Sequence, residues 1–155
     1  MDQPSPTNDW QSGFVARAVA AFDRATGDDL VREAGLDPAA LGQSAWEGNF
    51  ALLCHSTDAI LTYANRFALD LWEMDWPTMR VTPSRETAPE EDRATRAALL
   101  DAVARNGFIR NYTGRRVSRG GRHFLIENAT VWTMRDENGA VFGTGAFFRA
   151  ITRLD

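Results

Sequence analysis

The segment from residue 108 to residue 150 constrains the fold most, because its side chains alternate with a period of two, the spacing of β-strands. Gly120 and Gly121 supply one turn, and residues 136–139 supply another. Strands of this length joined by such short turns predict an antiparallel meander. The three predicted strands cover residues 108–118, 122–134 and 141–150.

Two shorter predicted strands precede this meander. Residues 50–55 and 60–64 are rich in apolar side chains and flank a short polar turn. Because successive side chains of a strand point to opposite faces, Leu53 and His55 share one face and Cys54 lies on the other. These two strands would extend the meander into a larger sheet.

Helices fill the chain between the two sets of strands. Asn65 is a typical N-cap for the helix that follows it, and Asp75 for a short helical turn after that. Thr87 begins a capping-box pattern for a longer helix of about residues 88–106, which ends at Gly107. Two strands, these helices and then three strands predict an α+β domain, a five-stranded antiparallel sheet with helices packed on one face.

The N-terminal part is predicted to be helical. We expect a flexible tail at residues 1–8, a helical segment at 9–49 and the core domain at 50–155. The first helix, about residues 9–26, must bury its apolar face on the domain's own sheet or on a second copy, and we favour a homodimer through this helix. That apolar face comprises Trp10, Phe14, Ala18, Ala21, Phe22 and Ala25.

Charge and cysteine content exclude several classes of function. All 17 basic residues are arginines, and with 21 acidic residues the net charge is −4, which argues against nucleic-acid or membrane binding. A single cysteine excludes an internal disulfide and a site built from several thiolates. The chain shows no signal-peptide pattern and no apolar run near the roughly 18 residues of a membrane span, so we expect a cytoplasmic protein.

Arg96 lies on the buried face of the long helix, three and four positions from Leu99 and Leu100. An inward-pointing arginine is strongly destabilising unless it is paired, so its partner is either an internal carboxylate or an anionic ligand. Glu127 and Asn128 interrupt apolar faces in the middle of a predicted strand. Buried polar groups are normally hydrogen-bonded, so we expect either a Glu127–arginine pair inside the domain or a contact with a ligand.

His55 and His123 are the two histidines of the chain. With Glu127 or Asp58 they could form a two-histidine, one-carboxylate site, but their spacing matches no metal motif and we predict no metal. His55 is either a satisfied structural residue or a neutral hydrogen-bonding group or base in a cavity. Cys54 points away from His55 along the strand, so we expect it to be a packing residue.

Three stretches of the sequence carry a resemblance to a known family. HSTDAILTYANRFALDLWEMDW, then PSR, then RATRAALLDAVARNGFIRNYTGRRVSRGGRHFLIENATVW resemble the MEKHLA domain, a PAS-like family. The resemblance covers roughly residues 10–148, and it departs from the family in the last strand, where Gly143 to Ala146 read GTGA. The family includes stand-alone bacterial proteins and the ends of plant homeodomain–leucine-zipper regulators, and we expect the stand-alone bacterial type.

The resemblance implies a five-stranded antiparallel sheet, a cavity between sheet and helices, and dimerisation through an N-terminal helix. Haem-binding relatives use a histidine in the long helix, and residues 88–106 contain none. Light-sensing (LOV-type) flavin relatives use a cysteine in an Asn-Cys-Arg motif, which Cys54 lacks. Haem and LOV-type flavin are therefore both disfavoured as cofactors.

These observations favour a sensory or regulatory module with an internal pocket for a small polar or anionic ligand. One alternative is a small enzyme with His55 and Glu127 as acid–base groups and arginines as anion clamps. Another is a dimerisation or adaptor domain whose interior is filled by side chains. The predicted ligand-binding residues are His55, Trp72, Arg85, Arg96, Tyr112, Arg116, Phe124, Glu127, Asn128 and Trp132.

Overall fold

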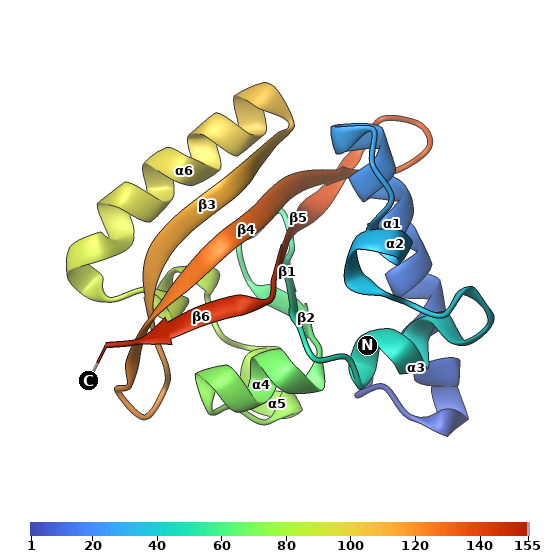
Figure 1. The fold of residues 1–155 in the computed structure, drawn as a ribbon, viewed down its shortest axis with the longest axis horizontal. Coiled ribbons are helices and arrows are strands. Elements are labelled where there is room, and N and C mark those ends of the chain that lie inside the picture. Colours follow the sequence, from blue (N-terminus) through green and yellow to red (C-terminus); the bar gives the residue numbers. More distant parts are fainter. Residues whose placement is uncertain (155) are drawn as a thin grey trace.

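The structure, a computed structural model, describes residues 1–154 as one antiparallel sheet with helices on both faces (Figure 1). The strand order is β2-β1-β5-β4-β3, and β6 pairs with the first half of β4. The strands are β1 Ala51–His55, β2 Leu61–Ala64, β3 Phe108–Val117, β4 His123–Arg135, β5 Val141–Phe148 and β6 Ala150–Arg153. The α-helices are α1 Ser12–Thr26, α2 Leu30–Ala34, α3 Leu41–Trp46, α4 Arg66–Trp72, α5 Trp76–Met79 and α6 Arg93–Asn106, with 3₁₀ turns at Pro6–Gln11, Pro38–Ala40, Ser84–Thr87 and Glu90–Asp92.

The predicted α+β architecture is confirmed, with one more strand than expected. The strand predicted at 141–150 is divided at Arg149 into β5 and β6. β5 pairs with the second half of β4, from Thr130 onward, whereas β6 pairs with the first half, from Phe124 to Glu127. β4 has 13 residues and β5 has eight, so β5 can pair with only part of β4. The chain therefore continues as β6, which pairs with the rest of β4.

Two asparagines break the alternation of the long strands. Asn111 in β3 and Asn128 in β4 have φ values of 56° and 52°, in the left-handed region that asparagine tolerates better than most residues. Beside them the register between β3 and β4 shifts, as in a β-bulge. As a result Ile126 and Val131 face the same side of the sheet, although strict alternation assigns them to opposite faces.

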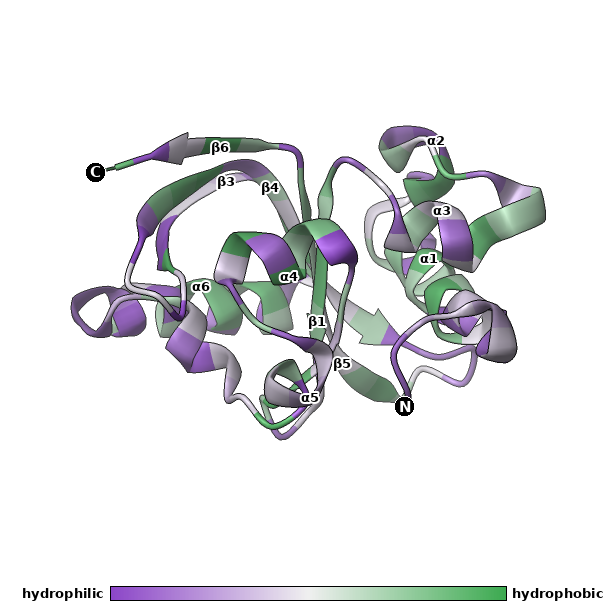
Figure 2. Cartoon of the chain, turned by 90° about the horizontal axis from the view of Figure 1, so that it is seen from below, coloured by the Kyte–Doolittle hydropathy of each residue, from purple (hydrophilic) through white to green (hydrophobic). Residues whose placement is uncertain are grey.

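The helices lie on opposite faces of this sheet. Figure 2 shows α1, α2 and α3 on one side of β1 and β5, with α6 on the other side. Val15, Ala18 and Ala21 of α1 are fully buried, and the Phe22 ring meets the Trp132 ring of β4 edge-on at 5.0 Å. We had assigned the inner face of α1 to a homodimer contact. In the structure this face packs against β4 of the same chain.

The first residues of the chain contact the domain. Pro4 is buried, the carbonyl oxygen of Met1 accepts a hydrogen bond from Trp76 Nε1 at 3.2 Å, and Asn8 caps the backbone of Ser5. These are the residues for which we had predicted a flexible tail. The helix predicted from residue 9 begins at Ser12, after a 3₁₀ turn.

Asn65 connects three elements at the centre of the fold, and its predicted role as an N-cap is confirmed. Its Oδ1 accepts from the backbone N–H groups of Ala68 (3.2 Å) and Leu52 (3.1 Å). Its Nδ2 donates to the carbonyl oxygens of Ala45 (3.0 Å) and Phe50 (2.7 Å). With no exposed surface, this one amide joins α3, β1 and α4.

The long helix ends where predicted and begins later. The Gly107 N–H donates to the Val103 carbonyl at 2.7 Å, which confirms the predicted stop. The predicted start at residue 88 is wrong, because α6 begins at Arg93. The Thr87 hydroxyl donates instead to the Ser84 carbonyl within the preceding 3₁₀ turn, so it does not cap α6.

Candidate functional site

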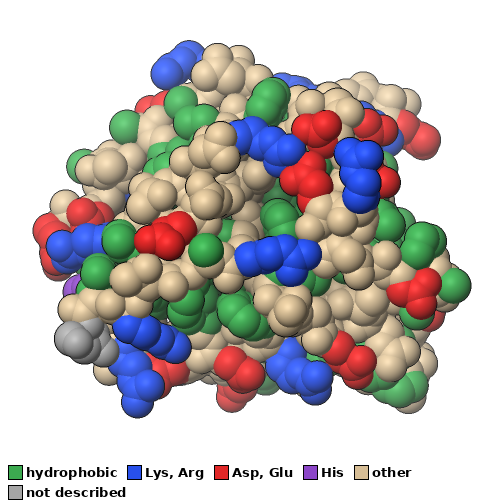
Figure 3. Space-filling model, viewed as in Figure 1, with side chains coloured by type: hydrophobic (Ala, Val, Ile, Leu, Met, Phe, Trp, Pro, Cys, Tyr) green, Lys and Arg blue, Asp and Glu red, His purple; other side chains and the backbone are tan. Residues whose placement is uncertain are grey.

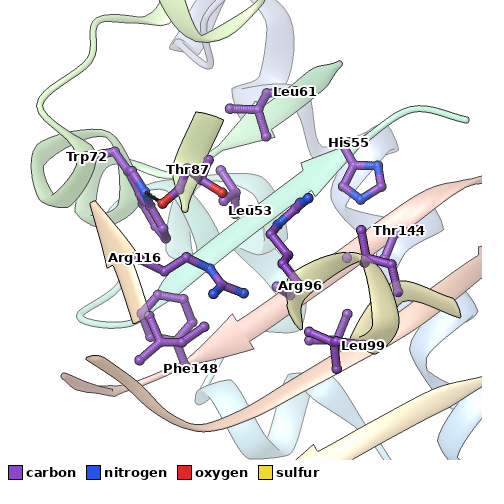
Figure 4. Close-up of a pocket in the computed structure, with 15 residues that line it drawn as sticks. Leu53, His55, Leu61, Trp72, Thr87, Arg96, Leu99, Arg116, Thr144 and Phe148 are labelled. Atoms are coloured by element: carbon purple, nitrogen blue, oxygen red, sulfur yellow. Dashed lines mark hydrogen bonds between the residues drawn. The ribbon is translucent and has the colours of Figure 1, made fainter. Parts of the chain in front are cut away.

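A cavity of about 40 Å³ lies between the sheet and helices α4 and α6 (Figure 4). Five strands, both helices and the 3₁₀ turn Ser84–Thr87 contribute to its wall. Its volume is far below the roughly 300–1,000 Å³ of sites for drug-sized ligands, and corresponds to a few water molecules or a small ion. Most of the wall is apolar and includes Leu53, Leu61, Trp72, Leu99, Ile126 and Phe148.

Two arginines from different elements reach this cavity. Arg96 extends from α6 and Arg116 from β3, and Figure 4 shows them across the same space. Arg116 is only 6% exposed; its Nη1 donates to the Arg115 carbonyl at 2.7 Å, and both of its Nη atoms lie 3.4 Å from the Tyr112 hydroxyl. Burial, followed by the charge of Arg116, lowers the pKa of Arg96 to about 10, below the usual range of an arginine.

No carboxylate among residues 1–154 balances these charges. The part of the chain that the structure describes gives the cavity no Asp or Glu side chain, and gives Arg96 no hydrogen bond or ion pair. Other arginines do have acidic partners: Arg110 pairs with Asp28 and Glu33 at 2.9 and 2.8 Å. Figure 3 likewise shows arginines interspersed with acidic groups on the outer surface.

His55 contributes a neutral imidazole to the same cavity. Its Nδ1 lies 3.0 Å from the Ser56 carbonyl oxygen, which can only accept, so Nδ1 carries the hydrogen. Burial is the main cause that lowers the pKa of His55, and the charge of Arg96 lowers it further. Nε2 is consequently an acceptor, and it is buried without a hydrogen-bond partner among residues 1–154.

One side of the cavity borders an open groove. His55, Leu100 and Thr144 belong to the walls of both spaces, and the groove outside them has a volume of about 240 Å³. These three side chains separate the cavity from solvent at this point. They therefore mark one route by which a small molecule could enter.

Four of the ten predicted binding residues line the cavity, namely His55, Trp72, Arg96 and Arg116. Two more do not line the cavity but contact residues that do. Tyr112 contacts the Arg116 guanidinium, whose carbon lies 5.5 Å from the Tyr112 ring centre. Phe124 is fully buried and packs against Trp72 with ring centres 5.2 Å apart.

The other four predicted residues lie elsewhere. Arg85 and Asn128 are exposed, and Trp132 packs on α1 at the opposite face of the sheet. Glu127 accepts a hydrogen bond from the Thr152 hydroxyl of β6 at 3.0 Å, not from an arginine. The bulge at Asn128 explains the error at Trp132, because alternation across the bulge assigned Trp132 to the same side of the sheet as Phe124.

Sequence reasoning missed the contribution of β5. Thr144, Gly145 and Ala146 line the cavity between His55 on β1 and Val131 on β4. The run of small residues was the available signal, since such residues leave space beside a sheet. We had treated this segment only as a departure from the related family.

The other residues considered as metal ligands or nucleophiles are either far apart or fully buried. His55 pairs with Thr144, which pairs with Thr133, whereas His123 lies ten positions earlier on β4, about 30 Å along the strand. Residues 1–154 contain no group of three or more His, Cys, Asp or Glu side chains placed to hold a metal. Cys54 is fully buried on the α1 side, and burial raises the pKa of its thiol.

The MEKHLA domain family matches residues 13–153. The chain belongs to this family. It is 27% identical over 142 residues to the homeobox-leucine zipper protein ATHB-9 of Arabidopsis thaliana, a match that covers 86% of this chain and 16% of the plant protein. The chain thus spans about a sixth of the length of that relative.

PAS domains share the fold of this MEKHLA domain. A PAS domain from Colwellia psychrerythraea has a TM-score of 0.61 at 15% identity, over 72% of this chain and 92% of that one. An RNA-binding light-oxygen-voltage receptor gives 0.61 at 22% identity over 78% of this chain and 33% of its own. A PAS domain in complex with ethanol, from a LuxR-family transcriptional regulator of Burkholderia thailandensis, gives 0.55 at 12% identity over 77% and 98%.

A helix that spans a membrane must be both long and predominantly apolar. No helix within residues 1–154 has both the length and the apolar character needed to span a bilayer.

Proposed function

We propose that this MEKHLA domain is a sensory module that binds a small anion between Arg96 and Arg116. One observation carries the proposal: two guanidiniums share a cavity to which residues 1–154 bring no carboxylate. A buried charge without a partner destabilises a fold, so its persistence is best explained by a ligand that supplies the opposite charge. Arginine suits this task because its planar fork binds carboxylate and other oxyanions through paired hydrogen bonds.

Ligand binding at this place would connect two elements of the fold. Arg96 belongs to α6 and Arg116 to β3, so an anion between them draws the helix toward the sheet. Without the anion the two positive charges repel each other, and α6 is held mainly by Leu99 and Val103. The change in position or rigidity of α6 is the signal that we propose.

The comparisons agree with a regulatory role. The plant relative is a homeobox protein, and one structural neighbour is the ethanol-bound PAS domain of a transcriptional regulator. We propose that this chain likewise acts in regulation, as part of a cytoplasmic bacterial protein. A homodimer stays a prediction, now through the outer face of α1, where Ala16, Arg17 and Arg24 lie beside a surface groove.

The two alternative functions lose support. The enzyme alternative used His55 or Glu127 as its general base, and of these two residues His55 lines the cavity whereas Glu127 lies outside it. The adaptor alternative required an interior filled by side chains, and it gives no reason for an unpaired Arg96. Binding of a small anion accounts both for the presence of the cavity and for an Arg96 side chain without an acidic partner among residues 1–154.

A thermal-shift titration tests the proposal. Purified protein is titrated with sodium acetate against sodium chloride at matched ionic strength. Acetate should raise the melting temperature saturably, since a ligand at a hundred times its Kd stabilises the folded state by about 2.7 kcal/mol. The effect should disappear in Arg96→Gln and in Arg116→Gln, and should persist in Arg105→Gln, an exposed arginine of the same helix. Equal responses in all four proteins would contradict the proposal.

A further inference from the structure

The cavity contains an unused acceptor as well as its two cationic donors. His55 Nε2 is buried and unpaired among residues 1–154, while Arg96 and Arg116 present N–H groups to the same space. In Figure 4 Arg96 lies between Arg116 and His55. A simple carboxylate satisfies the arginines and leaves Nε2 without a partner. The complementary ligand is one that accepts at one end and donates at the other.

We propose that the ligand is a short 2-hydroxy carboxylate, whose carboxylate binds Arg96 and Arg116 and whose hydroxyl donates to His55 Nε2. This inference rests on the proposed anion site and adds the chemical class of the ligand to it. The hydroxyl of such an acid lies one carbon from the carboxylate, and His55, Arg96 and Arg116 all line the same small cavity. His55 then determines specificity rather than affinity for anions in general.

The backbone determines which nitrogen of His55 is the acceptor. Ser56 is the next residue along the chain, and its carbonyl oxygen fixes the hydrogen on Nδ1. A proton on Nε2 as well would place a third positive charge beside Arg96 in a buried site, which is unfavourable. The imidazole therefore stays neutral and offers its Nε2 lone pair to a ligand donor.

Size and wall chemistry restrict the acid further. A volume of about 40 Å³ admits an acid of two or three carbons and excludes sugars and aromatic acids. Leu61, Trp72 and Phe148 provide apolar surface for the carbon chain and no partner for a second charged group. Glycolate and lactate meet these conditions, whereas dicarboxylates do not, and inorganic phosphate has no carbon chain to contact the apolar wall.

Isothermal titration calorimetry with matched pairs of acids tests this inference. Glycolate is compared with acetate, and lactate with propionate, because each pair differs by one hydroxyl group. In the native protein the hydroxy acid should bind about tenfold or more tightly, the value of one hydrogen bond to a buried acceptor. In His55→Phe, which removes the acceptor and keeps a planar ring, glycolate should weaken to the level of acetate while acetate changes little.

A second variant keeps the result interpretable. His55→Gln retains a side-chain carbonyl acceptor and should recover part of the preference for glycolate, and circular dichroism confirms folding of each variant. Equal affinity for glycolate and acetate in the native protein, or a preference that survives His55→Phe, overturns the hydroxy-acid inference and leaves the anion site standing. Tighter binding of phosphate than of glycolate also overturns it. Absence of binding by all of these anions overturns both proposals.

Discussion

Removal of the Arg96 charge should make the anion-free domain more stable. The guanidinium lies in a cavity beside Arg116 and has no acidic partner among residues 1–154. Arg96→Met keeps a long, flexible side chain that can fill the same space without a charge. The variant should therefore fold more stably and, at the same time, lose its response to anions.

The size of the effect follows from the pKa of Arg96. The pKa of Arg96 falls to about 10, well below the usual range of an arginine, and each pKa unit corresponds to about 1.4 kcal/mol. The charge thus destabilises the folded domain by up to about 3 kcal/mol. Because this pKa is lowered, the penalty is fully present below about pH 10 and is relieved only as the pH rises above that value. Substitution is therefore the practical way to remove it.

Urea denaturation and calorimetry in acetate-free buffer measure this change. We expect Arg96→Met to raise the free energy of unfolding by about 1–3 kcal/mol, which corresponds to roughly 2–12 °C in Tm for a chain of this size. Arg105→Met, on the exposed side of α6, should stay within about 0.5 kcal/mol of the native protein. A loss of stability in Arg96→Met would mean that the guanidinium is paired in the folded domain, and the reasoning for an anion site would fail.

Three further predictions concern other parts of the structure. Asn65→Ala should lower the free energy of unfolding by roughly 3 kcal/mol or more in urea denaturation, because four backbone groups lose their partner; an effect below about 1 kcal/mol would contradict that network. Arg110→Met should cost about 1–2 kcal/mol at low salt and less in 1 M NaCl, through loss of Asp28 and Glu33, and salt-independent loss would assign its role to packing. The pKa of His55 is lowered on folding, so its neutral form stabilises the domain above the unfolded value of 6.5 and this contribution is lost as the pH falls below it. His55→Phe should therefore reduce the decline in Tm between pH 7 and pH 5, and an unchanged decline would show that His55 does not titrate in this way.

The sequence was most informative where local chemistry determines structure. Asn65 and Asp75 cap their helices as predicted, and Gly107 ends α6. Each of these residues acts on backbone groups within a few positions, so its effect is visible without the rest of the fold. Arg96 also belongs to this group, because helical spacing alone placed it on the face of Leu99.

Prediction failed where residues far apart in the sequence together determine the structure. The left-handed conformation of Asn111 and Asn128 reverses the alternation of β3 and β4, so Arg110 contacts α2 whereas Arg116 faces the cavity. Nothing local distinguishes these asparagines from exposed strand residues. The burial of α1 depends on the surface offered by Trp132, which periodicity within α1 cannot reveal.

A crystal structure of the protein grown in saturating acetate tests the central claim most directly. The account predicts a planar carboxylate in the cavity, with its oxygens within hydrogen-bond distance of the guanidiniums of both Arg96 and Arg116. A cavity closed by side chains, or Arg96 turned outward onto an acidic residue of its own chain, would contradict it.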